Sequence, residues 1–505
     1  MAKIDEKVLW GAAVKLRDKC DPADYKNVVL GLVFLKYVSD KYLAKFNELK
    51  AFGDGREHDE DYYIADHVFI VPEKALWPYI ASYSKDESLG QKIDAAFDEL
   101  EKKNDELKGI LPKTYSKSEL DKVALGELVD FFTTQLKMED ADGDFFGQIY
   151  EYYIGAFATY IPQKGGEFFT PQSIVEMMVE ILQPYKGRVF DPCCGSGGMF
   201  VQCSKFVKEH RGKVDDISIY GQESNPGTWK MAKMNLAIRG LSGDLGDRNG
   251  DSFTDDLHKS LRADFILANP PYNIKDYWKP SLEGDPRWVF GKPDTKNANY
   301  AWLEIMYAKL APKGKAAILM PNGATTSNTE DDRKVRKAML EAGKVDAIVD
   351  LPDKLFSNTG ISVQCWVLDR AKTDTDVLFI NATKLGRMKT RKIRVFKGSE
   401  DDDNFDPKTE QNEIDLIAST YHKYKNNDGY KDKLGFCKKA TLDEIKEKDY
   451  SLNPGRYVGV DNSNQLSEEE LNEQLKQTAK ELFTLMDESK ELEEKVREIL
   501  KNEIK

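Results

Sequence analysis

Cysteine and histidine are scarce in this chain, which has six cysteines and five histidines among 505 residues. The cysteines show no CxxC pairing and no dense framework, so neither a zinc site nor a set of disulfides is expected. The histidines are scattered, and none stands at a ligand spacing. We therefore expect reduced thiols and a mechanism without a metal ion.

Long apolar runs are also missing. The longest, from Val28 to Leu35, ends at Lys36 and falls far short of the roughly 20 residues that span a bilayer. The first residues, Met-Ala-Lys-Ile-Asp-Glu-Lys, lack the apolar core of a secretion signal. The sequence therefore predicts a cytoplasmic protein that has no membrane segment.

Positive charge is in deficit. The chain has 74 Lys and Arg residues against 87 Asp and Glu residues, a formal net charge of −13. Non-specific affinity for DNA comes from Lys and Arg side chains that neutralise phosphates. If this chain acts on DNA, we expect a partner to supply much of the affinity for DNA.

The spacing of apolar residues divides the chain into three regions. In residues 1–150 they recur at helical spacing, as in Val8, Leu9, Ala12 and Leu16, which predicts an all-helical domain. Residues 151–460 alternate short β-rich runs with helical segments. Residues 461–505 are predicted to form one helix.

The middle region predicts an α/β fold. Strand alternating with helix is typical of a doubly wound, mostly parallel sheet, and ligands of such sheets bind at the carboxyl ends of the strands. The expected strands are 188–190, 217–220, 265–268, 316–319, 345–349 and 363–368.

The last region has a coiled-coil register over about four heptads. One heptad position carries Leu471, Thr478, Leu485, Leu492 and Ile499, and another carries Leu475, Leu482, Ser489 and Val496. Such a helix needs a partner, either another chain or the rest of its own chain. The acidic run from Glu400 to Asp403 is predicted to be a solvated loop.

A glycine-rich turn is the first candidate for a cofactor site. It runs from Asp191 to Phe200, with the sequence Asp-Pro-Cys-Cys-Gly-Ser-Gly-Gly-Met-Phe, between an expected strand and an expected helix. Glycines let the backbone approach a ligand, and a helix N-terminus offers free amides to a carboxylate. The spacing differs from the dinucleotide pattern GxGxxG, so no pyrophosphate is implied.

Two acidic residues follow at later strand ends. Glu223 follows the second strand, where a carboxylate can accept hydrogen bonds from ribose hydroxyls. Asp251 is expected at the end of a third strand, where it can accept from an adenine amine. Each alone fits a loop or capping residue, but in series with the glycine turn they indicate an adenosine-containing cofactor.

The most specific motif is Asn269-Pro270-Pro271-Tyr272, directly after an apolar strand. An adenine amine is a poor nucleophile because its lone pair is delocalised into the ring. The side-chain oxygen of Asn269 and the carbonyl of Pro270 can each accept one amine hydrogen and localise that lone pair. The prolines stiffen the loop, and Tyr272 can stack on a base that has left the duplex. The alternative interpretation is a proline-rich turn that Asn269 caps.

These motifs resemble those of the amino-methyltransferases of DNA. The sequences Gly166-Glu-Phe-Phe-Thr-Pro171, Ala268 to Tyr272 followed by Trp278, and Ser451-Leu-Asn-Pro-Gly-Arg-Tyr457 are similar to those of modification subunits of type I restriction-modification systems. The resemblance covers nearly the whole chain. It implies a Rossmann-like fold that uses S-adenosylmethionine to methylate the N6 amine of adenine.

The resemblance also implies site residues and partners. Asn269, Pro270 and Tyr272 are the expected catalytic residues, and Asn269 also borders the cofactor. Binding of S-adenosylmethionine is assigned to Phe169, Thr170, Pro171, Asp191, Gly195, Ser196, Gly197, Glu223 and Asp251. The Phe-Phe-Thr-Pro stretch also fits a helix start capped by Thr170. Modification subunits of this type act on DNA as two copies on one specificity subunit, and a restriction subunit can accompany them.

Two alternatives stay open. An Asn-Pro-Pro-Tyr loop also occurs in enzymes that methylate the glutamine amide of proteins, because a planar amide poses the same lone-pair problem. Methylation of the cytosine amine is a nearer variant, although enzymes of that class more often have Ser at the position of Asn269. A catalytically silent subunit that binds DNA or a partner is the second alternative. The intact motif residues Asn269, Tyr272, Glu223 and Asp251 argue against it.

Two further features have plain interpretations. Pro192-Cys193 resembles the nucleophile of cytosine ring-carbon methyltransferases, but it lies in the cofactor turn, so Cys193 and Cys194 are expected to be packing residues. A basic stretch fits either a phosphate contact or an exposed strand; it comprises Lys389, Arg391, Lys392, Arg394 and Lys397.

Overall fold

The computed structural model describes residues 6–17, 22–136, 145–160, 169–356 and 360–460, and single positions between 475 and 492. Two compact units are present, residues 1–458 and residues 459–505. Outside the described residues lie several positions of the predicted motifs and heptads: Gly166, Glu167, Phe168, Leu471, Leu485, Val496 and Ile499.

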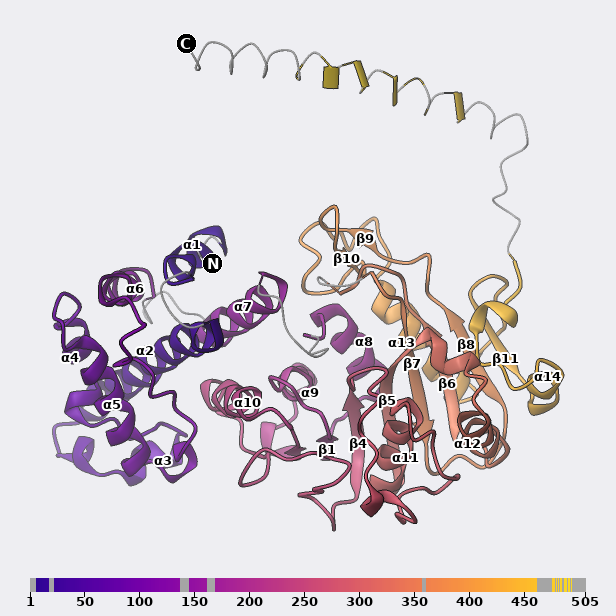
Figure 1. Ribbon diagram of the computed structural model, residues 1–505, viewed down its shortest axis with the longest axis horizontal. Helices are drawn as coiled ribbons and strands as arrows, with labels where there is room; N and C mark the ends of the chain where they lie inside the picture. Colours follow the sequence, from indigo (N-terminus) through magenta and orange to yellow (C-terminus); the bar gives the residue numbers. More distant parts are fainter. Residues whose placement is uncertain are drawn as a thin grey trace. The chain divides into compact units, whose positions relative to one another are not determined.

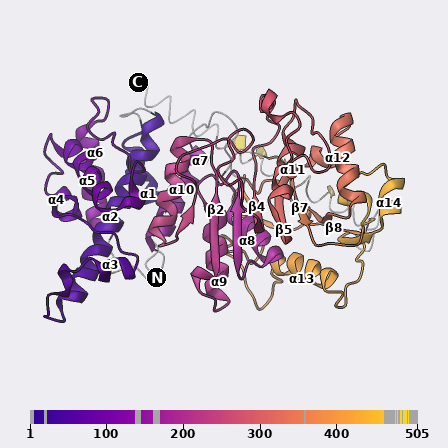
Figure 2. The ribbon, with the colours of Figure 1, turned by 90° about the horizontal axis from the view of Figure 1, so that it is seen from below.

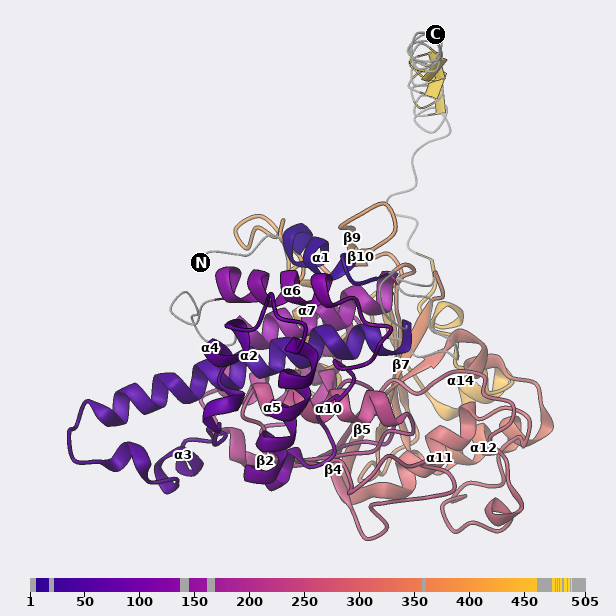
Figure 3. The same ribbon diagram turned by 60° about the vertical axis from the view of Figure 1, so that its left-hand side comes forward.

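The N-terminal part of the first unit is all-helical, as predicted. Its helices are α1 (Glu6–Val14), α2 (Pro22–Lys50), α3 (Asp61–Ala65), α4 (Trp77–Ala81), α5 (Leu89–Lys103), α6 (Lys122–Gln135) and α7 (Phe145–Tyr160). Helix α2 begins at Pro22, where a proline costs no hydrogen bond. It runs through the middle of this body and packs against α4, α6 and α7 (Figure 3). Helix α7 crosses the domain boundary expected at residue 150, and its residues share the helical core as far as Phe157.

The rest of the first unit is built around a large sheet (Figure 1). Its strands are β1 (Gly187–Asp191), β2 (Ile217–Gly221), β3 (Gly243–Asp244), β4 (Ala263–Ala268), β5 (Leu310–Pro321), β6 (Val345–Asp350), β7 (Val363–Asp369), β8 (Val377–Asn381) and β11 (Cys437–Ala440). The order across the sheet is β11-β8-β6-β7-β5-β4-β1-β2-β3. In this described part, β7 and β11 run antiparallel to the other strands, which are parallel. All six strands expected from the sequence are present.

Helices cover both faces of the sheet, as Figure 2 shows. They are α8 (Gln172–Leu182), α9 (Gly198–Glu209), α10 (Pro226–Ile238), α11 (Asn299–Lys309), α12 (Glu330–Glu341), α13 (Glu413–Lys425) and α14 (Leu442–Glu447). Alternate strand residues enter two separate cores: Val189 and Leu267 pack on the face covered by α8, α9 and α13, whereas Phe190 and Ile266 pack on the face covered by α11 and α12. Strands buried on both faces explain the nearly continuous apolar runs of the sequence.

Helix α10 joins the sheet to the helical domain. Trp229, Ala232 and Leu236 pack toward the sheet, whereas Met231 and Met234 belong to the core of the helical domain. Among the described helices, none is long and apolar enough to cross a membrane.

The acidic run from Glu400 to Asp403 is a loop as predicted, but only Glu400 and Asp403 are exposed. Asp402 is buried and its carboxylate lies 3.1 Å from Nε of Arg387, and Asp403 pairs with Lys389 at the same distance. The basic stretch forms a small hairpin of β9 (Arg387–Met388) and β10 (Arg394–Val395). Its residues Lys389, Arg394 and Lys397 each have a carboxylate partner, which favours the strand interpretation over a phosphate contact.

In the second unit, the described positions between 475 and 492 have helical backbone. Their apolar side chains Leu475, Leu482 and Leu492 are each more than half exposed. Leu475, Leu482 and Leu492 occupy predicted heptad positions.

Candidate active site

The order of the strands marks a crevice between β1 and β4. These two strands pair side by side, but the chain leaves β1 toward β2 and β3 and leaves β4 toward β5. Such a switch point opens a ligand site at the carboxyl ends of the strands. A cavity of about 470 Å³ is present there, and its lining includes Asp191 at the end of β1 and Asn269 directly after β4. This volume lies in the usual range for a small-molecule site.

The glycine turn forms the floor of this cavity. Asp191 ends β1, is 2% exposed, and accepts a hydrogen bond from the amide of Cys193 at 2.9 Å. Gly195 and Gly197 both have positive φ, 54° and 82°, and the second of them caps α9. Only glycine adopts this conformation without strain, so the turn can place free amides of the helix at the cavity.

Glu223 stands beside the turn. One carboxylate oxygen accepts from the amide of Gly195 at 3.1 Å, and the other accepts from the amide of Asn225 at 2.8 Å. The first of these oxygens belongs to a carboxylate with about four lone-pair sites in all, so Glu223 has the capacity to accept from a ligand hydroxyl as well. Its position matches the expectation from the sequence.

Asp251 lines the cavity too, but it does not end a strand as expected. The third strand, β3, is only two residues long and stops at Asp244, and Asp251 lies in the loop that follows. The backbone of this loop is fixed next to Glu223, because the amide of Gly250 donates to the Glu223 carbonyl at 2.9 Å. A loop held by such long-range contacts has no local sequence signal.

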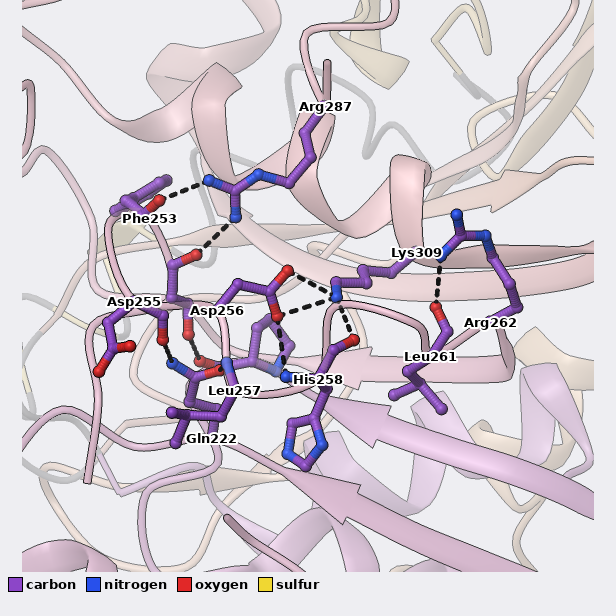
Figure 4. A network of polar contacts seen from close by, with 12 residues as sticks. Gln222, Phe253, Asp255, Asp256, Leu257, His258, Leu261, Arg262, Arg287 and Lys309 are labelled. Carbon is purple, nitrogen blue, oxygen red and sulfur yellow. Dashed lines mark hydrogen bonds and ion pairs between the residues drawn. The ribbon is translucent and has the colours of Figure 1, made fainter. Parts of the chain in front are cut away.

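A polar network behind the cavity holds this loop (Figure 4). The side-chain Nε2 of Gln222 donates to the carbonyls of Gly250 and Asp255, at 3.0 and 2.7 Å. Arg287 donates to the carbonyl of Ser252 at 2.7 Å and also to that of Phe253. Lys309, almost fully buried, pairs with Asp256 at 2.7 Å. The network fixes both ends of the segment that carries Asp251.

Aromatic side chains form the wall next to Asp251. The rings of Phe253 and Trp302 are 4.3 Å apart, and those of Phe253 and Tyr277 are 4.9 Å apart. All three residues line the cavity together with Ile274. An apolar wall beside a carboxylate suits a planar heterocycle that carries an amine.

The Asn-Pro-Pro-Tyr loop contributes to the lining as well. Asn269, Pro270 and Pro271 line the cavity. The carboxamide of Asn269 is held on both sides: its nitrogen donates to Oγ1 of Thr170 at 3.0 Å, and its oxygen accepts from the hydroxyl of Tyr272 at 2.5 Å. The side chain is therefore oriented by two partners, one of them 99 residues away in sequence.

The exit of this loop is also fixed. Asn273 has a positive φ of 57°, and its amide donates to the side chain of Asn299 at 2.9 Å. Asn299 is the first residue of α11, and its side-chain nitrogen in turn donates to the side-chain oxygen of Asn273 at 3.0 Å. Asparagine tolerates the left-handed conformation better than most residues.

The structure brings most of the predicted site residues to this one cavity. Its lining includes Phe169, Thr170, Asp191, Gly195, Ser196, Glu223, Asp251, Asn269 and Pro270, whereas Pro171, Gly197 and Tyr272 do not line it. Pro171 occupies the N-cap position of α8 without a side-chain bond, so Thr170 does not cap that helix. Gly197 shapes the turn, and the ring of Tyr272 packs against the sheet core.

Burial shifts the titration of several groups. It raises the pKa of Asp191 to about 7, against the opposing effect of hydrogen bonds from Cys193. Burial also raises the pKa of the Cys193 thiol well above its ordinary value, and that of the Tyr272 hydroxyl. A thiol held protonated is a poor nucleophile, which agrees with the packing role predicted for Cys193.

Several residues of the cavity were missed by the sequence reasoning. Phe253, Tyr277 and Trp302 come from loops and a helix with no motif of their own, and the helical domain adds Lys26, Ile154, Phe157 and Ala158. The packing of Phe169 near Gly155 of α7, with its ring 3.7 Å from the place of a Cβ, brings this domain to the site. No sequence pattern indicated these residues.

Comparison with known proteins identifies the family. The model of the N-6 DNA methylase family matches residues 141–466, and that of the HsdM N-terminal domain matches residues 6–132. The methylase subunit of the type I restriction enzyme HindI from Haemophilus influenzae is 42% identical over 402 residues, 78% of this chain and 87% of the relative. The MjaIX methylase subunit from Methanocaldococcus jannaschii is 34% identical over 524 residues, 98% of this chain and 90% of the relative.

Solved structures agree. The methyltransferase subunit of a type I restriction-modification system from Streptococcus thermophilus superposes with a TM-score of 0.76 at 26% identity, covering 90% of this chain and 98% of that one. A modification subunit of a putative type I restriction enzyme from Vibrio vulnificus has a TM-score of 0.61 at 18% identity, with 87% and 93% covered. The chain belongs to the N-6 DNA methylase family, among the methylase subunits of type I restriction enzymes, and is an adenine-specific DNA methyltransferase.

Proposed function

We propose that this chain transfers the methyl group of S-adenosylmethionine to the N6 amine of an adenine that has left the DNA duplex. One observation carries the proposal: the glycine turn after β1 and the Asn-Pro-Pro-Tyr loop after β4, which follow two paired parallel strands, line one and the same cavity. A donor site and an amine-activating corner must be neighbours for direct transfer, because positioning supplies most of the catalysis.

The residues of the cavity fit this cofactor. Glu223 and Asp251 offer acceptors for ribose hydroxyls and an adenine amine, and the wall of Phe253, Tyr277 and Trp302 suits a purine ring. Asp191 gives a carboxylate near the cationic methionine end, beside Phe169 and Thr170. When bound, S-adenosylmethionine supplies a methyl group activated by a sulfonium.

Asn269 and Pro270 would act on the target base. The carboxamide oxygen of Asn269 and the carbonyl of Pro270 each accept one hydrogen of the amine, which favours a tetrahedral nitrogen with a localised lone pair. Thr170 and Tyr272 orient the carboxamide. We assign the ring of Tyr272 to stacking on the extruded base, which requires the ring to become accessible from its present packing.

The partners follow from the same proposal. An acidic chain lacks the charge for strong DNA binding by itself, so we assign sequence recognition to a specificity subunit that carries two copies of this chain, with a restriction subunit as a further partner. The exposed leucines between 475 and 492 are candidates for that assembly contact. The setting is the cytoplasm, where the chain meets DNA.

A labelled-methyl assay tests the proposal. Purified chain, with its specificity subunit, is incubated with methyl-labelled S-adenosylmethionine and either duplex DNA or a protein extract. We expect label only in DNA, as N6-methyladenine after digestion. Label in protein glutamine would favour amide methylation, label in cytosine would favour the neighbouring class, and binding without any transfer would favour a silent subunit.

A further inference from the structure

The helical N-terminal domain forms part of the candidate methyl-transfer cavity. Lys26 of α2 and Ile154, Phe157 and Ala158 of α7 line it, next to Thr228 and Met231 of α10. Three of these domain residues are apolar. The helical domain therefore contributes one polar side-chain group to the lining, the ammonium of Lys26.

The arrangement of this wall is fixed by contacts to α10. Arg239, at the end of α10, donates to Glu151 at 2.9 Å and to the carbonyl of Gly147 at 2.8 Å, both on α7. The hydroxyl of Tyr150 donates to the Met231 carbonyl at 3.4 Å. Since the guanidinium is nearly buried, the pair resists solvent screening. Helix α10 itself begins just after Glu223, so one helix connects the cofactor acid to the helical domain.

Charge within the cavity is unbalanced. The lining residues in the described part of the chain include four carboxylates, Asp191, Glu223, Asp251 and Asp276, and Lys26 is the only Lys or Arg among them. Lys26 is half-buried, and no hydrogen bond or ion pair joins its ammonium to any described residue. A partly desolvated ammonium against an apolar wall gains from an anionic partner.

We propose that Lys26 binds the carboxylate at the methionine end of S-adenosylmethionine, so that the helical domain contributes directly to cofactor binding. This inference rests on the proposed function. The hydroxyls, the amines and the sulfonium of this cofactor all match carboxylates of the cavity, whereas its carboxylate requires a cation or free amides. The Lys26 ammonium complements it together with the amides at the start of α9.

Two ligands separate this contact from the rest of the site. S-adenosylhomocysteine carries the methionine-type carboxylate, and 5′-methylthioadenosine has the same adenosine but no amino-acid end. Isothermal titration of the full chain measures the affinity for both, in the unmodified protein and in Lys26→Met and Lys26→Arg. Lys230→Met is the matched control, because Lys230 is also half-buried but lines a different cavity of about 260 Å³.

We expect Lys26→Met to weaken S-adenosylhomocysteine binding about tenfold, the value of one partly solvated charge-assisted hydrogen bond. Binding of 5′-methylthioadenosine should stay within about twofold, Lys26→Arg should keep most of the affinity, and Lys230→Met should keep all of it. Circular dichroism melting checks that every variant is folded.

Three results would overturn the inference. Equal affinity of Lys26→Met and the unmodified chain for S-adenosylhomocysteine would refute the Lys26 contact alone. A variant that binds this ligand normally but loses affinity for duplex DNA, with a smaller dependence on salt, would assign the ammonium to a phosphate instead. Failure of the unmodified chain to bind either adenosine compound would refute the proposed function, and the Lys26 inference with it.

Discussion

The hydroxyl of Tyr272 donates to the carboxamide oxygen of Asn269 at 2.5 Å. In the proposed mechanism, the same oxygen accepts a hydrogen bond from the target amine. A carboxamide oxygen has two lone pairs, so it can accept from both groups at once. Tyr272 therefore holds the acceptor in place, in addition to the stacking role proposed for its ring.

Replacing Tyr272 by Phe separates these two roles. The ring remains, but the hydrogen bond to Asn269 is lost, so we expect the methyl-transfer rate to fall about tenfold with little change in DNA affinity. Tyr272→Ala removes the ring as well and should cost a further factor of about ten or more, because base stacking contributes about 1–3 kcal/mol. Single-turnover rates measure both. Equal rates in the Phe variant and the unmodified chain would show that the hydrogen bond has no role in catalysis.

Affinity for the cofactor should rise with pH. The pKa of Asp191 is raised by burial to about 7, so its ionised fraction grows from about one tenth at pH 6 to about nine tenths at pH 8. The ligand is cationic at its methionine end and prefers the ionised carboxylate. We expect the dissociation constant of S-adenosylmethionine to fall up to about tenfold over this range, with proton release on binding, measured by calorimetry in buffers of different ionisation enthalpy.

Asp191→Asn provides the control for this pH dependence. Burial also raises the pKa of Glu176 and of Glu304 to about 8, but neither lines the cavity. Their titration should persist in the Asn variant, whereas the change in affinity between pH 6 and 8 should disappear. An unchanged pH profile would contradict the role of Asp191.

The effect of Asp191 on the stability of the fold has the opposite sign to its effect on cofactor affinity. The folded chain keeps a proton on Asp191 that the unfolded chain releases, so Asp191 lowers the free energy of unfolding as the pH rises from about 4 to 7.

The strands and the motifs at their ends could be predicted because their signals are local. An apolar run followed by Asp-Pro-Cys-Cys-Gly or by Asn-Pro-Pro-Tyr indicates a strand and the turn after it. Strands β3, β8 and β11 were missed. Strand β3 has two residues and β11 has lysines at two of its four positions, whereas β8 is a short apolar run, Val-Leu-Phe-Ile-Asn, that could have been predicted. Their pairing depends on neighbours that are distant in sequence.

The contacts that complete the site could not be predicted in the same way. The bond from Asn269 to Thr170 joins residues 99 positions apart, and Lys26 reaches the cavity because α2, which carries it, packs against α7 and α10. A lysine on a long helix is usually solvated, so nothing in its local sequence distinguishes Lys26. Tertiary packing decides which of these side chains reach the cavity.

The Arg287 contacts should affect cofactor affinity rather than the transfer step. Arg287→Met removes two hydrogen bonds to the loop that carries Asp251, so we expect S-adenosylmethionine to bind about tenfold more weakly while the single-turnover rate at saturation stays within about twofold. Arg262→Met is the matched control, because Arg262 is exposed and, among the residues that the structure describes, bonds only to the carbonyl of its neighbour Leu261. Equal losses in the two variants would contradict a specific role for Arg287.

Deletion of residues 465–505 should disrupt assembly with the specificity subunit. The removed segment carries the exposed leucines 475, 482 and 492 and lies outside the compact unit of residues 1–458, so the truncated chain should fold and bind S-adenosylmethionine normally. Size-exclusion chromatography with light scattering on the mixed subunits measures the complex. A truncated chain that still forms the complex of normal mass would require another assembly surface.

The most direct test of the central claim is the single-turnover rate of Asn269→Ala, measured on a duplex that contains the target site. If the carboxamide localises the lone pair of the amine, the rate falls about a hundredfold or more, while the affinity for S-adenosylmethionine in the same preparation changes by no more than about twofold. A variant that methylates DNA at the rate of the unmodified chain would contradict the claim.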